Sequence, residues 1–277
     1  MMYLFFIVYI FTVSIITKVY GDTYPMCGDC WCIPAENGTA PCPKYWQPQT
    51  EFSSASINTY LKQIPNEIYT LNCNPYKDST CMTTPMQDYL DSDAAVCGYV
   101  YNNLEDGSKS CSQYSMVTYN NRSDLMKAGA IITHEGSCGL CSTTQDLAIY
   151  LTQDFTDAGK KCATKGLFNE QAGLDCYMAL GLTLECAKIW NYDGIYDGQV
   201  CTKTCLGELT DPNNGPAPAC ELNDCLQCDE QFAGPIFSAY AGRTRRRSGL
   251  LSEIIRDCSS IARINVYDSC SNPTCGC

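Results

Sequence analysis

The single histidine of the chain, His134, is the side chain best suited to acid–base chemistry near neutral pH. Glu135 follows it, and Asp146 lies where the first turn of a helix is expected. Gly136 and Gly139 permit a tight turn between them, and backbone N–H groups at the start of a helix can bind an anion or an oxyanion. If the protein is an enzyme, we therefore expect His134 to be its general base, with Asp146 as a second candidate catalytic residue.

Two cysteines with Cys-x-x-Cys spacing, Cys138 and Cys141, follow this histidine. They could bind zinc together with His134 and Glu135, or supply a nucleophilic thiolate. Disulfide bonding is the stronger expectation, because all 22 cysteines lie after Gly21 in a chain that begins like a secreted protein. We therefore expect no metal, and the absence of a phosphate-binding or dinucleotide-binding glycine motif predicts no other cofactor.

A second group that could do chemistry is a run of arginines on an otherwise acidic chain: Arg243, Arg245, Arg246 and Arg247. With Ser248 it stands just before a segment, residues 248–264, whose apolar spacing predicts a helix. Arginine side chains and helix N–H groups there could bind a sulfate, a phosphate or a carboxylate. Two alternatives remain open, namely a secretory processing site of the form Arg-x-x-Arg and internal pairing with acidic residues.

The start of the chain indicates an extracellular protein. Residues 1–21 contain a short apolar run followed by small residues, which is typical of a cleaved signal peptide, and no later run is long enough to span a membrane. The formal net charge of −12 argues against nucleic acid as a partner. Asn37 and Asn121 begin sequons for N-glycosylation.

The even number of cysteines allows all of them to pair. Such density suggests service in a harsh or proteolytic extracellular setting, because a chain of this length can bury a core without covalent help. The cysteines that we expect in disulfides include Cys138, Cys141, Cys162, Cys176, Cys186, Cys201, Cys205, Cys220, Cys225, Cys228, Cys258 and Cys270.

Helical periodicity and capping signals occur along most of the chain. They predict a helix over residues 52–64 capped by Ser53 or Ser54, a helix after the Ser-Thr-Thr-Gln capping box of residues 142–145, and two helices within residues 168–192. Alternating tyrosines predict strands near residues 99–101 and 114–119. We expect these tyrosines to cover a small sheet with their hydroxyl groups in water, while a sugar-stacking face is the alternative.

These elements predict a mainly α fold with a small β element, in a single disulfide-dense secreted domain with irregular cysteine-stapled ends. The expected organisation is a signal peptide (residues 1–21), a lead-in rich in cysteine and proline (residues 22–50) and a mainly helical domain (residues 51–277). The sequence Thr-Asp-Pro-Asn-Asn-Gly-Pro-Ala-Pro-Ala at residues 210–219 marks a possible internal boundary.

Two functions are compatible with this sequence. The preferred hypothesis is a secreted, non-catalytic protein that binds an anionic small molecule or a glycan near Arg243 to Arg247. The alternative is a secreted hydrolase or lyase that acts on an acidic substrate, with His134 as base. A single histidine without an obvious catalytic partner is weak evidence for catalysis, so the hypothesis of a binding protein is favoured. The sequence does not indicate an oligomeric state.

Overall fold

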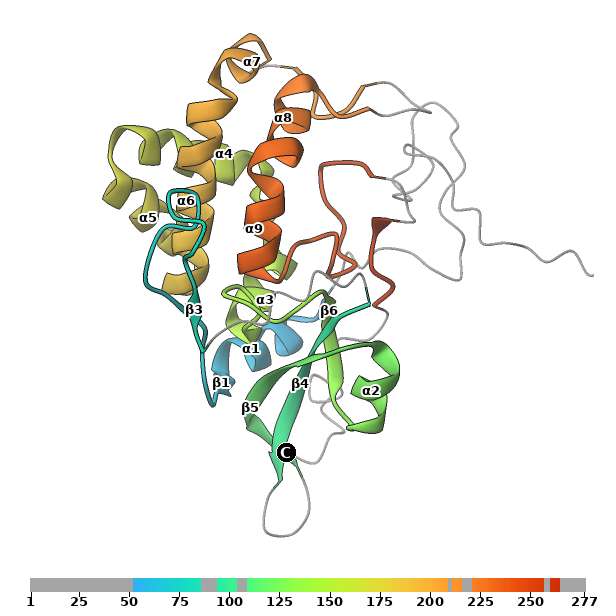
Figure 1. Cartoon of the computed structure of the whole chain (residues 1–277). Coiled ribbons are helices and arrows are strands. Elements are labelled where there is room, and N and C mark those ends of the chain that lie inside the picture. Colours follow the sequence, from blue (N-terminus) through green and yellow to red (C-terminus); the bar gives the residue numbers. More distant parts are fainter. Residues whose placement is uncertain are drawn as a thin grey trace, which may run out of the picture.

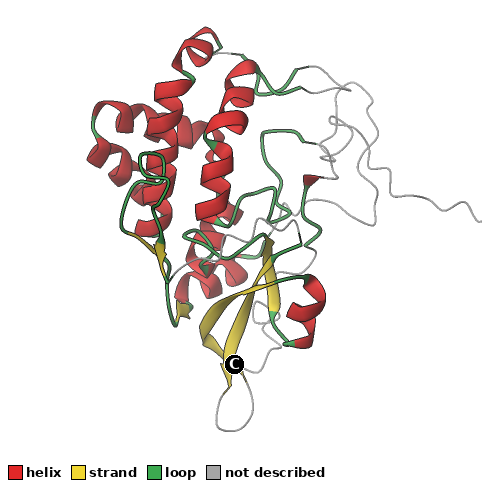
Figure 2. Cartoon of the chain, viewed as in Figure 1, coloured by secondary structure: helices red, strands yellow, loops and turns green. Residues whose placement is uncertain are grey.

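The computed structural model describes residues 52–85, 94–103, 109–208, 211–215, 221–256 and 260–264. The expected signal peptide, the lead-in, Asn37, Cys220, Cys258 and Cys270 lie outside these residues. The described residues form a mixed α/β structure, in which most helices lie at one end and the main sheet lies at the other (Figures 1 and 2). The expectation of a mainly α fold with a small β element is therefore corrected, because the strands form a four-stranded sheet.

The helices and strands follow one another in an irregular order along the chain. The helices are α1 (Ser54–Lys62), α2 (Arg122–Lys127), α3 (Thr144–Thr152), α4 (Phe155–Phe168), α5 (Glu170–Ala179), α6 (Leu184–Val200), α7 (Thr202–Gly207), α8 (Asp224–Phe232) and α9 (Gly234–Ala241). The strands are β1 (Ile64–Pro65), β2 (Thr70–Leu71), β3 (Thr83–Thr84), β4 (Val96–Asn103), β5 (Lys109–Tyr119) and β6 (Ile131–Glu135).

The main sheet has the strand order β1-β5-β4-β6, and a second pair joins β2 to β3. Strand β4 is antiparallel to both of its neighbours, with Tyr99 opposite Met116 and Tyr101 opposite Tyr114. The predicted strands near residues 99–101 and 114–119 are therefore confirmed. Figure 1 shows β4, β5, β6 and α2 at one end of the molecule, α4 to α9 at the other, and α1 and α3 between them.

The sheet tyrosines face the protein interior, which corrects the expectation that their hydroxyl groups reach water. Tyr99, Tyr101 and Tyr114 are all buried. The Tyr99 hydroxyl donates to the Ser142 carbonyl at 2.7 Å, and the Tyr114 hydroxyl accepts from the Thr144 backbone N–H at 2.8 Å. The sheet therefore positions the first turn of α3 through tyrosine hydroxyls.

Local signals located most of the predicted helices correctly. Helix α1 begins after Ser53, whose side chain accepts from the Ser56 N–H, and α5 and α6 are the two helices predicted within residues 168–192. The cap of α3 is Thr143, one residue later than the predicted box begins, with Asp146 as its partner. Helix α4, capped by Asp154, was not predicted.

The predicted helix over residues 248–264 is wrong for the residues that the structure describes. Residues 245–249 form turns, and residues 251–256 contain no helix. Gly249 adopts a φ of 64°, where a Cβ atom would lie 2.4 Å from the Ala262 carbonyl oxygen. The apolar spacing predicted a helix because Leu250, Ile261 and Ile264 are all buried. In the structure an irregular segment places each of them in the core separately, so they do not share one helix face.

Six disulfides join the described elements: Cys73–Cys81, Cys97–Cys138, Cys141–Cys186, Cys162–Cys176, Cys201–Cys228 and Cys205–Cys225. Disulfides at this density are typical of an oxidising compartment. Within the described ranges, none of the helices has the length and apolar character needed to cross a membrane. In the loop predicted at residues 210–219, Asn214 exchanges hydrogen bonds of 2.9 Å with the backbone of Ile255.

Candidate functional site

His134 lies on β6 and has no exposed surface. Its Nδ1 atom is 2.8 Å from the Glu135 carbonyl oxygen, and its Nε2 atom is 2.7 Å from Ser142 Oγ. A carbonyl can only accept, so Nδ1 carries the proton and donates, while Nε2 of the neutral ring accepts from the Ser142 hydroxyl. Burial and the nearby charge of Arg243 lower the pKa of His134 well below its usual value. The imidazole is thus a neutral, enclosed element of the interior.

The turn after His134 uses its backbone donors inside the protein. The Cys138 N–H donates to Thr118 Oγ1 at 2.9 Å, and the Gly139 N–H donates to Ser142 Oγ at 2.8 Å. The next two N–H groups donate to the last carbonyls of α9, and a Cβ atom on Gly139 would lie 2.4 Å from the Tyr240 carbonyl oxygen. The anion or oxyanion site expected at this turn is therefore replaced by a contact between the turn and α9.

The two cysteines of this turn are not paired with each other. Cys138 is bonded to Cys97 of β4, and Cys141 is bonded to Cys186 of α6. Neither sulfur is a free thiolate that could bind zinc or attack a substrate. The two bonds instead fix the turn between the sheet and the helices.

Asp146 is fully buried in the first turn of α3. Its carboxylate accepts from the Thr143 hydroxyl at 2.6 Å, from the Thr183 N–H at 2.8 Å and from the Thr183 hydroxyl at 2.8 Å. Burial raises its pKa to about 6, and these hydrogen bonds oppose the rise. The hydrogen bonds of Asp146 go to Thr143 and Thr183, not to His134.

Arg243 is also fully buried, and all of its polar hydrogens are directed at oxygen atoms of the protein. Its Nε donates to the Cys141 carbonyl at 3.1 Å, and Nη1 donates to the Thr133 carbonyl and to Ser248 Oγ, each at 3.1 Å. Its Nη2 donates to the Tyr99 hydroxyl at 2.9 Å and to the Thr133 hydroxyl. This guanidinium and Ser248 offer no surface to an external anion or to a processing protease.

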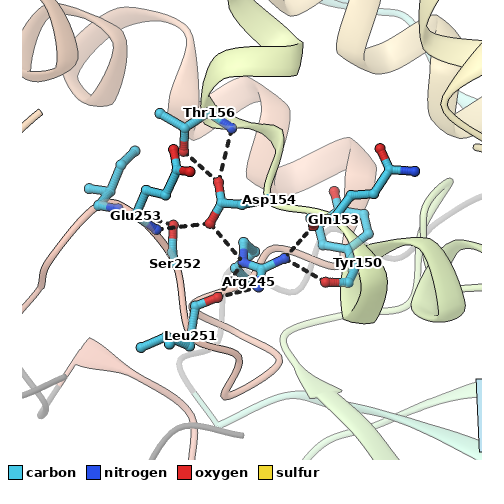
Figure 3. Close-up of polar contacts among 9 residues, drawn as sticks. Tyr150, Gln153, Asp154, Thr156, Arg245, Leu251, Ser252 and Glu253 are labelled. Carbon is cyan, nitrogen blue, oxygen red and sulfur yellow. Dashed lines mark hydrogen bonds and ion pairs between the residues drawn. The ribbon is translucent and has the colours of Figure 1, made fainter. Parts of the chain in front are cut away.

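The other arginines of the run are also engaged internally. Figure 3 shows Arg245 donating to the carbonyls of Tyr150, Gln153 and Leu251 and lying beside Asp154, with 3.5 Å between Arg245 Nε and Asp154 Oδ2. Arg246 Nη1 lies 3.6 Å from Glu230 Oε2. Arg247 Nη1 donates to the Ser238 carbonyl at 2.6 Å. Internal pairing with acidic residues, one of the alternatives for this run, thus describes Arg245 and Arg246. Arg243 and Arg247 are instead engaged with carbonyl and hydroxyl oxygens.

The sequon residue Asn121 is half-buried at the start of α2. Its side chain accepts from the Asp124 N–H at 3.0 Å and donates to Asp124 Oδ2 at 2.9 Å. The side-chain nitrogen that a glycan would modify is therefore engaged in a helix cap.

A cavity of about 250 Å³ lies among α4, α6, α8, α9 and the chain that follows α9. His134, Asp146 and Arg243 do not line it, whereas Arg245 and Arg246 do. The helices that surround it pack on one another, and Figure 1 shows α6, α8 and α9 together in the helical half of the molecule. The cavity has the size and the mixed apolar and polar lining of a site for a small ligand.

One wall of the cavity is aromatic and is centred on Trp190 of α6. The Trp190 ring centroid lies 4.6 Å from that of Phe237, 5.3 Å from that of Phe155 and 6.0 Å from that of Tyr177. Trp190 Nε1 donates to the Tyr150 hydroxyl at 2.9 Å, which fixes the orientation of the indole. The wall therefore presents a preformed apolar surface.

Acidic side chains on α6 and α8 line the same cavity: Asp193, Asp197, Asp229 and Glu230. Asp193 Oδ1 accepts from the Tyr76 hydroxyl at 2.7 Å. Burial, reinforced by the charges of Asp197 and Glu230, raises the pKa of Asp193 to about 7. Burial raises the pKa of Asp197 to about 6, and burial together with the neighbouring carboxylates raises the pKa of Asp229 well above its usual value.

Basic residues balance only part of this acidity. Arg246 and Arg256 both pair with Glu230, the latter through Nη2 at 2.5 Å from Oε1. In the described part of the chain, no lysine or arginine lies within 4.0 Å of Asp193, Asp197 or Asp229. Three partly buried aspartates thus line the cavity without an ion-pair partner in the part of the chain that the structure describes.

The sequence contained one signal for this site that was not recognised. Trp190, Asp193, Gly194 and Asp197 are spaced i, i+3, i+4 and i+7, so they share one face of α6. Aspartate is unusual on the apolar face of a core helix. The contribution of Asp229 could not be read in this way, because α8 meets α6 only in the folded protein.

Residues 170–264 match a family described as a family of unknown function, DUF8771. The matched segment includes Trp190 and all four acidic residues on α6 and α8, whereas α4 lies before it. None of the curated proteins and none of the solved structures matches the chain.

Proposed function

We propose that this chain is a secreted, disulfide-stapled protein that binds a small glycan, or one sugar unit of a larger glycan, in the cavity among α4, α6, α8 and α9. The observation that carries the proposal is the pairing of an aromatic wall, centred on Trp190, with carboxylates on α6 and α8. A sugar ring has apolar C–H faces and polar edges, so it needs both kinds of surface in one cavity.

The size and rigidity of the cavity support a ligand of this class. A volume of about 250 Å³ is small for a drug-sized molecule and suits a single ring. The indole is held by the Tyr150 hydroxyl, and Arg245 is held by carbonyl oxygens, so these walls are ordered before a ligand enters. Preformed walls reduce the entropy lost on binding.

The location of the protein belongs to the same proposal. The signal peptide expected at residues 1–21 would deliver the chain to the secretory pathway, where disulfides form. The six disulfides of the described residues are consistent with that route. Extracellular glycans would then be the most abundant sugar ligands available to it.

A glycan screen on the secreted protein tests this function. Ser238 lines the cavity from α9, so Ser238→Trp should fill it. Gln231→Trp on the exposed side of α8 is the matched control, because Gln231 is exposed and does not line the cavity. We expect the wild type and Gln231→Trp to retain the same glycan and Ser238→Trp to lose it. If Ser238→Trp still retains the glycan, the binding site lies outside the cavity. If the wild type binds no glycan, the proposed function is rejected.

The hydrolase or lyase alternative depends on the contact between His134 Nε2 and Ser142 Oγ. Neither side chain has exposed surface, so a substrate could reach them only after the surrounding structure moved. The same glycan samples can be analysed for cleavage products. Turnover that disappears in His134→Gln would favour this alternative over binding without catalysis.

A further inference from the structure

We propose that the ligand of the cavity carries a cationic amino group, and that Asp193, Asp197 and Asp229 bind this ammonium while Trp190 packs against the body of the ligand. This inference rests on the proposed function, because it names the kind of sugar bound at the same site. An amino sugar combines a ring with an ammonium in one small molecule.

The acidic end of the cavity has unused hydrogen-bonding capacity. Asp197 Oδ1 is buried and has no hydrogen-bond partner among the described residues. In the described part of the chain, the carboxyl group of Asp229 accepts no hydrogen bond, and Asp193 uses Oδ1 for the Tyr76 hydroxyl. Buried polar atoms are nearly always satisfied, so an orphaned oxygen at a cavity wall indicates a missing donor. An ammonium supplies three donors from one atom.

The charges around the acids favour a cation over an anion. Asp193 and Asp197 of α6 line the cavity, and so do Asp229 and Glu230 of α8. The basic groups that face the cavity come from α4 and from the chain after α9: Lys160, Arg245, Arg246 and Arg256. Lys160 donates to Asn213 Oδ1 at 3.0 Å, and the three arginines contact Asp154 or Glu230. These positive groups make their close contacts with Asn213, Asp154 or Glu230. In the described residues the three aspartates form no ion pair, although the charge of Arg256 opposes the rise in the pKa of Asp229.

The aromatic wall favours an organic cation over a bare metal ion. Calcium requires six to eight oxygen ligands and magnesium a near-octahedral oxygen shell. Here the cavity that holds the carboxylates is also lined by Trp190 and Tyr177, and aromatic rings attract organic cations. No group of three or more acidic, cysteine or histidine residues in the described ranges has the geometry of a metal site.

Binding of an ammonium should displace protons from the site. The pKa of Asp193 is raised to about 7 and that of Asp197 to about 6, so near neutral pH the empty cavity retains part of its protons. A fixed positive charge favours the ionised carboxylates and lowers these pKa values. Hydroxyl sugars lack that charge and should bind without releasing protons.

The test compares glucosamine with glucose and galactosamine with galactose. In each pair, the second sugar has a hydroxyl group where the first has an ammonium. Affinity is measured by NMR titration at pH 6.5, and proton release by calorimetry in two buffers of different ionisation enthalpy. We expect an amino sugar to bind at least about tenfold more tightly than its hydroxyl counterpart. Proton release should accompany only the amino sugar.

Two variants locate the effect. Asp197→Asn removes the orphaned carboxylate and should abolish the preference for the amino sugar, whereas Asp175→Asn on the exposed surface of α5 should leave it unchanged. Asp197→Asn should fold, because it removes a partly buried charge that has no ion-pair partner in the described ranges. The melting temperature of each variant verifies folding.

The remaining outcomes separate this inference from the proposed function. Equal affinity for both sugars, lost in Ser238→Trp, would uphold glycan binding and overturn the ammonium proposal. No binding of any sugar, in the titrations and the glycan screen alike, would overturn both. If calcium chloride shifts the resonances of the cavity residues and amino sugars do not, the site binds a metal ion and the ammonium proposal is overturned. A preference for amino sugars that persists in Asp197→Asn would also contradict it.

Discussion

Arg243 is a buried cation with no carboxylate beside it in the described structure. Carbonyl and hydroxyl oxygens from β4, β6, the turn after β6 and the segment after α9 stabilise it. A guanidinium suits this role because its donors are planar and spread in fixed directions. The run of arginines suggested an external ligand, yet burial made this arginine a structural crosslink. The sequence correctly indicated that Arg243 would donate several hydrogen bonds. It did not indicate which oxygen atoms accept them.

Replacement of Arg243 by lysine should destabilise the protein strongly. An ammonium can reach only some of the oxygen atoms that the guanidinium satisfies, and the remainder would be buried without donors. We expect Arg243→Lys to lower the free energy of unfolding by about 3 kcal/mol. Urea unfolding measures the change. Arg122→Lys, at a partly exposed ion pair with Glu135, is the control and should cost less than about 1 kcal/mol. Equal losses would contradict the structural role of Arg243.

His134 should make the protein less stable as the pH falls below about 6.5. The folded pKa is lowered, so in that range the unfolded chain binds a proton that the folded protein does not. His134→Gln keeps a donor and an acceptor but does not titrate. We expect the free energy of unfolding of the wild type, relative to that of the variant, to fall by up to about 1.4 kcal/mol per pH unit below 6.5.

Denaturant unfolding of both proteins between pH 7.5 and 5 measures this difference. The acidic residues are common to both proteins, so their contributions cancel in the comparison. Parallel curves would show that His134 accepts a proton in the folded state and is less enclosed than its contacts indicate.

At the scale of elements, α6 combines two roles on one face. Trp190 builds the aromatic wall, and Asp193 and Asp197 place carboxyl groups beside it. Enclosed acids with raised pKa values destabilise a folded protein at neutral pH, because ionisation in the folded state is costly. A stability cost of this kind is common where a site serves function.

Asp193→Asn should therefore stabilise the protein at high pH. The folded pKa of Asp193 is raised to about 7 from a usual value of 3.8, so the wild type loses stability as the pH rises through that interval. The asparagine oxygen can still accept from the Tyr76 hydroxyl. We expect the variant to gain at least about 1 kcal/mol relative to the wild type at pH 8, and almost nothing at pH 4.

Thermal unfolding at both pH values provides the measurement. Asp175→Asn on the exposed surface of α5 is the control and should behave like the wild type at each pH. A loss of stability in Asp193→Asn at pH 8 would show that the charged form of Asp193 is favoured in the folded protein.

The success of sequence reasoning depended on how local each signal was. Helix α1 and the α5–α6 pair were predicted because caps and apolar spacing act within a few residues. The chain after Ser248 carried the same spacing but takes its conformation from Gly249 and from contacts with residues far along the chain. The candidate site was missed for a related reason, since its acids come from two helices that meet only on folding.

At the scale of the molecule, two disulfides hold the acidic end of the cavity together. Cys201 and Cys205, at the end of α6 and in α7, are bonded to Cys228 and Cys225 of α8. These bonds fix the helix that carries Asp193 and Asp197 against the helix that carries Asp229. The walls of the site therefore depend on covalent links as well as on packing.

Removal of the Cys201–Cys228 bond should weaken ligand binding as well as stability. We expect the double variant Cys201→Ser, Cys228→Ser to lose about 2–4 kcal/mol of unfolding free energy. Removal of Cys97–Cys138, which joins β4 to the turn after β6 and does not line the cavity, should also lower stability but leave affinity for the glycan unchanged. Unfolding curves and glycan titrations of both variants test this difference. Unchanged affinity in the first variant would show that α6 and α8 hold the site without the bond.

Asp146 has a consequence for how the two halves of the molecule can move. Its carboxylate accepts from Thr143, which caps α3 beside the sheet, and from Thr183, which caps α6, the helix that lines the cavity further along. One carboxylate thus serves as a common pivot for the starts of both helices. A rotation of α6 against α3 would have to preserve these hydrogen bonds and the Cys141–Cys186 disulfide, so Asp146 limits how far the helical half can turn relative to the sheet.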